Sequence, residues 1–119
     1  MLVVDDSFET RELYALYLRH RGFEVLTAAD GQGAIEIASS LTPDVVVLDL
    51  SMPRVNGITV TQMLKREPGT QKIPVIMLTG YPSRAIEQGA LEAGVAVFLT
   101  KPCLPEELEE HVRRLLARR

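Results

Sequence analysis

Five polar residues that could act together chemically stand at the ends of short apolar runs. Asp5 and Asp6 follow "MLVV", Asp49 lies within "VVVLDLSMP", Thr79 ends "IPVIMLT", and Lys101 follows "VAVFLT". Carboxylates that crowd together repel one another and raise each other's pKa values. A hard divalent cation relieves this repulsion, and Mg²⁺ in particular favours carboxylate and water oxygens. A hydroxyl and an ammonium at neighbouring strand ends would add a hydrogen-bond donor and a positive charge beside such a cluster.

A purely local role is the alternative for each of these residues. Aspartate at a strand-to-helix turn is often a helix N-cap, and that explanation is adequate for any one acid. Three acids, a hydroxyl and an ammonium at four strand ends are harder to explain in this way. The remaining predicted strand, which runs through Ala28 and Ala29 to Asp30, brings no obvious reactive group to the same edge.

The elements that must position these residues follow from the apolar pattern. Five runs rich in Val, Ile, Leu and Phe mostly lack alternation, which is typical of strands buried on both faces of a parallel sheet. The segments between them have helical spacing. The predicted strands are residues 1–4, 24–28, 44–50, 73–79 and 95–100, and the predicted helices are residues 7–21, 33–41, 57–66, 83–93 and 105–118.

Each predicted helix carries an apolar stripe that we expect to face the sheet. The stripe residues are Leu13, Tyr14, Tyr17, Leu18, Ile35, Ala38, Leu41, Ile58, Met63, Leu64, Ile86, Ala90, Leu91, Leu108, Val112, Leu115 and Leu116. Alternation of strands and helices of this length predicts a (βα)5 chain with right-handed crossovers and helices on both faces of an open parallel sheet. Ligands of such sheets bind beyond the carboxyl ends of the strands, where the five polar residues stand.

Composition narrows the class of protein. The chain has 119 residues, 46% of them hydrophobic and 24% charged, which is ordinary for one globular domain. A net charge of −3 gives no electrostatic footprint for direct nucleic-acid binding. Apolar runs are too short for a membrane span, and "MLVVDD" lacks the basic start of a signal peptide. The single cysteine, Cys103, cannot form an internal disulfide, so we expect a cytoplasmic protein.

The motifs resemble those of a known family. The acidic pair after the first strand, "DLSMP" with Gly57 downstream, "LTG" and "FLTKP" are similar to the receiver domain of two-component response regulators. The likeness covers essentially residues 1–119 as one domain and implies a flavodoxin-like sheet with strand order 2-1-3-4-5. It also implies a phosphorylation-activated signalling switch that catalyses only its own phosphorylation and dephosphorylation.

The resemblance assigns roles at the acidic site. Asp49 would be the phosphoacceptor, charged by a sensor histidine kinase or a histidine phosphotransfer protein. Asp5, Asp6 and Asp49 would hold Mg²⁺, with Asp5 acting largely through water, and the backbone carbonyl of Ser51 would be a further ligand. Gly80 would leave room for a bulky phosphodonor.

The resemblance also implies how a signal would leave the site. Thr79 would bond a phosphoryl oxygen, and Lys101, followed by a cis bond to Pro102, would pair with Asp49 and then with the phosphoryl group. Phe98 would be the rotating switch residue, although plain core packing also explains a Phe in a strand. The face formed by 83–93, 95–100 and 105–118 would then bind a downstream protein or a second copy of the chain.

Two positions beside the site are expected to tune the lifetime of the phosphoryl group. Ser51 lies two residues after Asp49, and Tyr81 lies two residues after Thr79. We hypothesise that Tyr81 shields the site from water. We also expect no output domain in this chain, which is then either a stand-alone regulator or a fragment of a longer protein.

Two other functions compete with this interpretation. A degenerate receiver would bind a partner without ever carrying phosphate, although every matching polar residue is present. A Mg²⁺-dependent phosphohydrolase of the haloacid dehalogenase type would need a second aspartate two residues after Asp49, where this chain has Ser51.

Four further features are given structural explanations. "DGQGAIE" (30–36) only half matches a dinucleotide-binding loop and follows the wrong strand. His20 and His111 lie on charged helical segments and are expected to be solvated. Cys103 is interpreted as a small packed residue. The basic "RRLLARR" complements the negative end of a helix.

Overall fold

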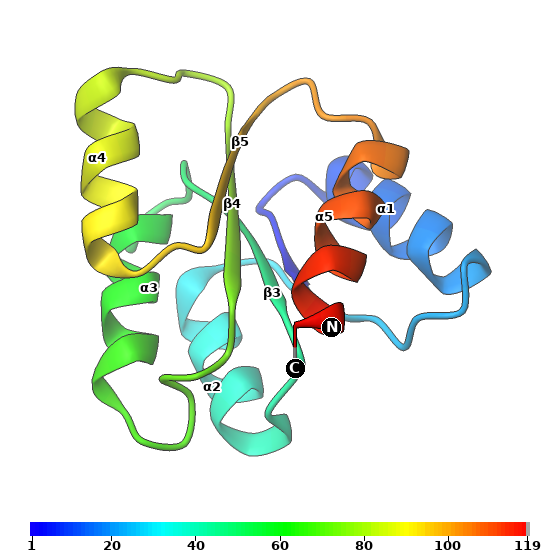
Figure 1. Ribbon diagram of the computed structural model, residues 1–119, viewed down its shortest axis with the longest axis horizontal. Coiled ribbons are helices and arrows are strands. Elements are labelled where there is room, and N and C mark those ends of the chain that lie inside the picture. The colour runs from blue at the N-terminus through cyan, green and yellow to red at the C-terminus, as the bar shows by residue number, and fades with distance from the viewer. Residues whose placement is uncertain (119) are drawn as a thin grey trace.

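A computed structural model describes residues 1–118, in which five strands and five helices alternate along the chain (Figure 1). The elements are β1 (Leu2–Val4), α1 (Phe8–His20), β2 (Leu26–Ala28), α2 (Gly31–Leu41), β3 (Val46–Asp49), α3 (Gly57–Arg66), β4 (Val75–Thr79), α4 (Arg84–Ala93), β5 (Val97–Thr100) and α5 (Pro105–Ala117). Every predicted element is present. The observed boundaries differ from the predicted ones by a few residues at most.

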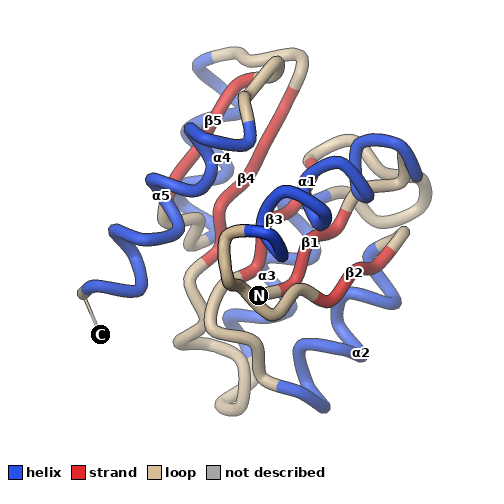
Figure 2. Tube along the Cα trace, turned by 90° about the vertical axis from the view of Figure 1, so that its right-hand side faces the viewer, coloured by secondary structure: helices blue, strands red, loops and turns tan. Residues whose placement is uncertain are grey.

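All strand pairs are parallel, and the sheet order is β2-β1-β3-β4-β5 (Figure 2). The predicted flavodoxin-like architecture is therefore confirmed. The register brings Val4 beside Leu48, and Leu48 beside Met77. The carboxyl ends of β1, β3 and β4 consequently lie at one edge, which aligns the residues that follow them.

Helices cover both faces of the sheet. Figure 1 shows α2, α3 and α4 on one face and α1 and α5 on the other. Two apolar clusters fill the two interfaces, one around Met77 and Leu64 and the other around Leu18 and Leu108. Burying this apolar surface is the main favourable term in folding. Because β1, β3 and β4 are buried along their whole length, the groups at their tips stand on a rigid base.

Burial at the sheet edges and on the helix margins is lower than predicted. Leu26 on β2 is 37% exposed, and β5 is only half-buried, since each edge strand has a neighbour on one side only. Four expected stripe residues are also exposed: Leu13, Leu41, Met63 and Leu91. Small residues such as Ala15, Ala38 and Ala90 are fully buried on these helices, and the exposed leucines and methionine lie at the margins of the stripes.

The helix caps show which acidic residues have a structural role and which belong to the candidate site. The carboxylate of Asp30 caps α2 by accepting a hydrogen bond from the Gly33 amide at 2.8 Å. Ser7 caps α1 and Asn56 caps α3. Asp5, Asp6 and Asp49 are therefore not the caps of the helices that follow them, and the local capping explanation applies to Asp30 alone among these four acids.

Candidate functional site

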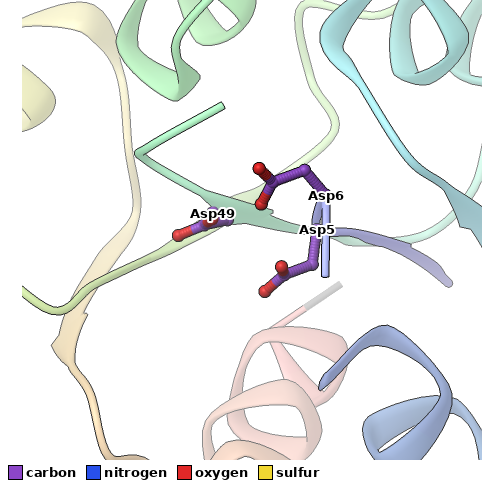
Figure 3. A group of neighbouring side chains, drawn as sticks. All are labelled: Asp5, Asp6 and Asp49. Atoms are coloured by element: carbon purple, nitrogen blue, oxygen red, sulfur yellow. The ribbon is translucent and has the colours of Figure 1, made fainter. Parts of the chain in front are cut away.

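Three carboxylates gather where β1 and β3 end. Asp5 and Asp6 follow β1, Asp49 ends β3, and one oxygen from each lies within 4.8 Å of the others (Figure 3). Asp5 and Asp49 are buried, whereas Asp6 is exposed. The pairing of β1 with β3 explains this convergence, because it holds the two strand ends side by side.

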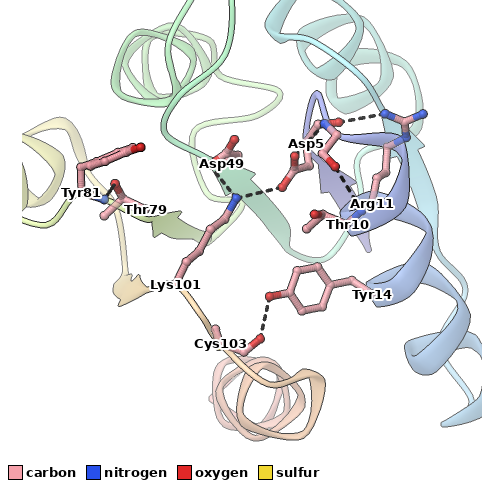
Figure 4. Close-up of polar contacts among 10 residues, drawn as sticks. Asp5, Thr10, Arg11, Tyr14, Asp49, Thr79, Tyr81, Lys101 and Cys103 are labelled. Atoms are coloured by element: carbon pink, nitrogen blue, oxygen red, sulfur yellow. Dashed lines mark hydrogen bonds and ion pairs between the residues drawn. The ribbon is translucent and has the colours of Figure 1, made fainter.

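Lys101 connects two of these acids. Its Nζ atom lies 3.2 Å from Oδ2 of Asp5 and 3.2 Å from Oδ1 of Asp49 (Figure 4). One ammonium faces three carboxylates, so the site keeps an excess of negative charge. This charge excess, together with exposed Asp6, makes the cluster attractive to a cation that enters from solvent.

Burial and nearby charges have opposing effects on the pKa values of Asp49 and Lys101. Burial raises the pKa of Asp49, the ammonium of Lys101 opposes that rise, and the nearby Asp5 charge adds to it. Burial lowers the pKa of Lys101, but the attraction of Asp49 and Asp5 outweighs burial and leaves that pKa above its ordinary value. Asp49 is thus a carboxylate whose charge the surrounding protein only partly compensates.

The backbone and side chain of Asp5 are held from three sides. The Ser7 amide donates to Oδ1 at 2.9 Å, and Lys101 occupies Oδ2. The guanidinium of Arg11, one turn along α1, donates to the Asp5 backbone carbonyl at 2.9 Å. Both oxygens of Asp5 therefore already have partners within the protein.

Thr79 ends β4 between Asp49 and Lys101 in the sheet order. It is buried, its hydroxyl accepts a hydrogen bond from the Tyr81 amide at 3.1 Å, and its carbonyl accepts one from the Lys101 amide at 2.7 Å (Figure 4). Tyr81 itself is 79% exposed, so it covers little of the site in this conformation. Ser51 is also exposed.

Phe98 and Pro102 complete the set of predicted residues. Phe98 lies on β5 beside Met77 of β4 and is partly buried against the cluster that faces α2, α3 and α4. The peptide bond between Lys101 and Pro102 is cis. Phe98 therefore lies on the strand that leads directly to Lys101.

Two contacts around the site could not be found from the residue pattern. These are the bond from Arg11 to Asp5 and a bond from the buried Tyr14 hydroxyl to the Cys103 carbonyl at 2.7 Å. The only available signal was Tyr14 in a predicted buried stripe, because a buried tyrosine needs a partner for its hydroxyl. Which partner it takes depends on the packing of α1 against the segment before α5.

Steric contacts explain why glycine occupies position 57, which is part of the family motif. A Cβ atom there would lie 2.7 Å from the Asp49 carbonyl oxygen and 3.0 Å from the Leu50 Cα. The Gly57 amide also donates to the Leu50 carbonyl at 2.9 Å. Only glycine allows the start of α3 to approach the end of β3 this closely.

Comparison with known proteins identifies the family. The family model described as "Response regulator receiver domain" matches residues 1–113. The chain belongs to this receiver family. Receiver domains of two-component systems are phosphorylation-activated switches, and the fold described above is that of such a domain.

Individual receivers and regulators are similar over nearly the whole chain. The chain is 42% identical over 118 residues to the probable transcriptional regulator ycf27 of Cyanophora paradoxa, covering 99% of this chain and 48% of that protein. It is 37% identical to the DNA-binding dual master transcriptional regulator RpaA of Synechocystis, covering 99% of this chain and 49% of RpaA. The receiver domain thus spans about half the length of these curated relatives.

Solved structures agree with this assignment. The chemotaxis protein CheY4 of Vibrio cholerae superposes with a TM-score of 0.91 at 32% identity, covering 96% of this chain and 95% of that one. A receiver domain of a histidine kinase from Syntrophus aciditrophicus gives a TM-score of 0.89 at 34% identity, covering 98% and 88%. Within residues 1–118, no helix combines the length and apolar character needed to cross a membrane.

Proposed function

We propose that this receiver accepts a phosphoryl group on Asp49 and that the phosphorylated form has changed affinity for a protein partner. The observation that carries the proposal is buried Asp49 paired with Lys101 at 3.2 Å, with oxygens of Asp5 and Asp6 within 4.8 Å of it. Family membership supports a histidine kinase or a histidine phosphotransfer protein as the phosphodonor.

The donor set suits Mg²⁺. Asp6 and Asp49 would bind it directly, Asp5 would act through water, and the backbone carbonyl of Ser51 would add an oxygen from the loop after β3. All of these are hard oxygen donors, and exposed Asp6 leaves room for the waters that Mg²⁺ retains. The cation would neutralise negative charge on the oxygens around the transferred phosphorus.

In the proposed step an Asp49 carboxylate oxygen attacks the phosphorus of a phosphohistidine. The new O–P bond forms as the N–P bond of the donor breaks, and the released imidazole takes up a proton. Lys101 then moves its ionic contact from Asp49 to a phosphoryl oxygen, and the Thr79 hydroxyl donates a hydrogen bond to another. Asp49 needs no general base, because it attacks as a carboxylate.

The output would begin with Thr79 and Phe98. Movement of Thr79 toward the phosphoryl group would vacate space for Phe98, which has no hydroxyl and so would act by packing alone. A charge-assisted hydrogen bond contributes about 1.5–3 kcal/mol, whereas a shift from 1:99 to 99:1 needs about 5.5 kcal/mol. Thr79 alone is therefore insufficient, and the Lys101 and backbone contacts must contribute.

The face formed by α4, β5 and α5 is the proposed docking surface for the downstream protein or for a second copy of the chain. It adjoins Phe98 and presents exposed Leu91 on α4 and Leu104 just before α5. We further propose a cytoplasmic location, for which the free thiol of Cys103 is the supporting observation.

Intact-mass spectrometry after incubation with acetyl phosphate and Mg²⁺ tests the proposal. We expect one phosphoryl group on the wild type and none on Asp49→Asn. Asp30→Asn is a matched control, because it changes an acid at the end of another strand, β2, and keeps a capping side chain. Repeated turnover without an adduct would favour a phosphohydrolase, and an unmodified wild type would favour a receiver that only binds partners.

A further inference from the structure

A buried hydroxyl joins α1 to the segment that carries Lys101. Tyr14 is 5% exposed, and its hydroxyl donates to the backbone carbonyl of Cys103 at 2.7 Å (Figure 4). Cys103 lies two residues after Lys101, in the connection between β5 and α5. The contact therefore links the helix that follows Asp5 and Asp6 to the lysine that pairs with Asp5 and Asp49.

The segment from Lys101 to Cys103 is held at both ends. At its start the Lys101 amide donates to the Thr79 carbonyl at 2.7 Å, which continues the pairing of β5 with β4. At its end the Cys103 carbonyl accepts the Tyr14 hydroxyl. Between these two points the Lys101 side chain must extend far enough to place Nζ 3.2 Å from both Asp5 and Asp49.

We infer that Tyr14 is a positioning residue for Lys101: its hydroxyl fixes the β5–α5 segment so that the ammonium reaches the acceptor carboxylate. The inference rests on the proposed phosphorylation of Asp49. Tyr14 touches neither the carboxylates nor the phosphoryl group in this proposal and acts only through the Cys103 backbone.

The physical reason is the cost of an unpaired carbonyl. Without the hydroxyl, the Cys103 carbonyl would remain buried beside an apolar ring, and the segment would shift toward water or another donor. Positioning errors are costly in phosphoryl transfer, since a 1 Å misplacement can reduce a rate by about 100-fold. Burial raises the pKa of Tyr14 to about 12, so the phenol stays protonated and remains a donor at physiological pH.

The chain itself provides a matched control. Tyr17 lies one turn further along α1, and its hydroxyl donates to Oε1 of Glu109 on α5, also at 2.7 Å. Tyr17→Phe removes a hydrogen bond between α1 and α5 of the same length as the one that Tyr14→Phe removes. The Tyr17 contact lies on α5 itself, away from the Lys101–Cys103 segment.

The test compares the two variants with the wild type in phosphorylation by acetyl phosphate and Mg²⁺, at a temperature well below both melting temperatures. We expect Tyr14→Phe to lower the rate at saturating donor by about tenfold, less than the roughly 100-fold cost that a full 1 Å misplacement can have. Tyr17→Phe should stay near the wild-type rate even if it melts earlier. Equal rates for the two variants would overturn the inference and leave the proposed function intact.

Hydrogen exchange of the Lys101 amide gives a second measurement that needs no phosphoryl transfer. If Tyr14 fixes this segment, the Lys101 amide exchanges faster in Tyr14→Phe than in Tyr17→Phe. Should the wild type fail to accept phosphate, the proposed function is wrong, and this exchange comparison alone decides whether Tyr14 positions Lys101. Equal exchange in both variants then refutes the positioning role.

Discussion

The ammonium of Lys101 lies 3.2 Å from Oδ1 of Asp49 although their strands are not neighbours. Asp49 ends β3 and Lys101 follows β5, so the lysine side chain reaches across the end of β4, where Thr79 stands. In the proposed phosphorylated form, the phosphoryl group on Asp49 would adjoin the Lys101 ammonium and the strand end that carries Thr79. The charge state of Asp49 therefore depends on both its burial and this ammonium.

Asp49→Asn is expected to raise the free energy of unfolding at neutral pH in the absence of Mg²⁺. Burial, the largest cause, raises the pKa of Asp49, so ionising it costs more in the folded chain than in the unfolded chain. The stability that the Asp49 carboxyl group contributes to the wild type is therefore fully present below its unfolded pKa. It is lost as pH rises through the folded pKa. Urea melts across a pH series should show the variant's advantage shrinking toward acid pH, and an advantage independent of pH would contradict this account.

Mg²⁺ is expected to make the wild type more stable than Asp49→Asn, the reverse of their order without the metal. A ligand that binds only the folded state at about 100 times its Kd stabilises it by about 2.7 kcal/mol. Asp6→Asn should weaken this stabilisation while changing the metal-free melting temperature little, because Asp6 is exposed. Thermal melts with and without Mg²⁺ measure both effects, with Ca²⁺ as a test of size selectivity. A full Mg²⁺ shift in Asp6→Asn would remove this residue from the ligand set.

The architecture was predictable from the sequence because a parallel sheet needs continuous apolar strands, and these fix where each strand ends. Asp5, Asp6, Asp49, Thr79 and Lys101 could be grouped for that reason alone. Partners chosen by tertiary packing could not be predicted, as the hydroxyl of Tyr14 illustrates. The exposure of Leu13 and Leu91 was missed for a related reason, since apolar spacing does not say which side of a stripe lies closest to the sheet.

Glu109→Gln is expected to destabilise the contact between α1 and α5 at neutral pH. Glu109 accepts from Tyr17 at 2.7 Å and pairs with Arg21 and Arg113, and these partners, Tyr17 first, lower its pKa to about 2. A depressed folded pKa means that the stabilisation is present above the unfolded value of 4.5 and is lost as pH falls toward about 2. The melting-temperature gap between wild type and variant should therefore narrow over this pH range, whereas a constant gap would indicate that the carboxylate charge contributes nothing.

Tyr81→Ala is expected to shorten the lifetime of the phosphoryl group if the ring closes over the modified Asp49. Tyr81 is 79% exposed in this structure, so shielding requires its side chain or the β4–α4 connection to rearrange on phosphorylation. Loss of the adduct after removal of the donor, followed by intact mass, measures the lifetime. Ser51, the other position expected to tune this lifetime, lies on the loop after β3, and a substitution there provides a comparison for the effect of Tyr81→Ala on the lifetime. An unchanged dephosphorylation rate in Tyr81→Ala would show that the ring excludes no water.

Two glycines beside the site should respond differently to the same added methyl group. In Gly57→Ala the Cβ would meet the Asp49 carbonyl oxygen at 2.7 Å, and backbone cannot move aside easily, so we expect a loss of about 1–3 kcal/mol in unfolding free energy. At Gly80 nothing lies within 4 Å of an added Cβ, so Gly80→Ala should melt close to the wild type. Its effect should instead depend on donor size: phosphorylation by acetyl phosphate should be nearly unchanged, while transfer from a histidine phosphotransfer domain should slow, because the methyl group projects where that protein would dock. Equal slowing with both donors would mean that Gly80 acts on the chemistry of Asp49 and not on access to it.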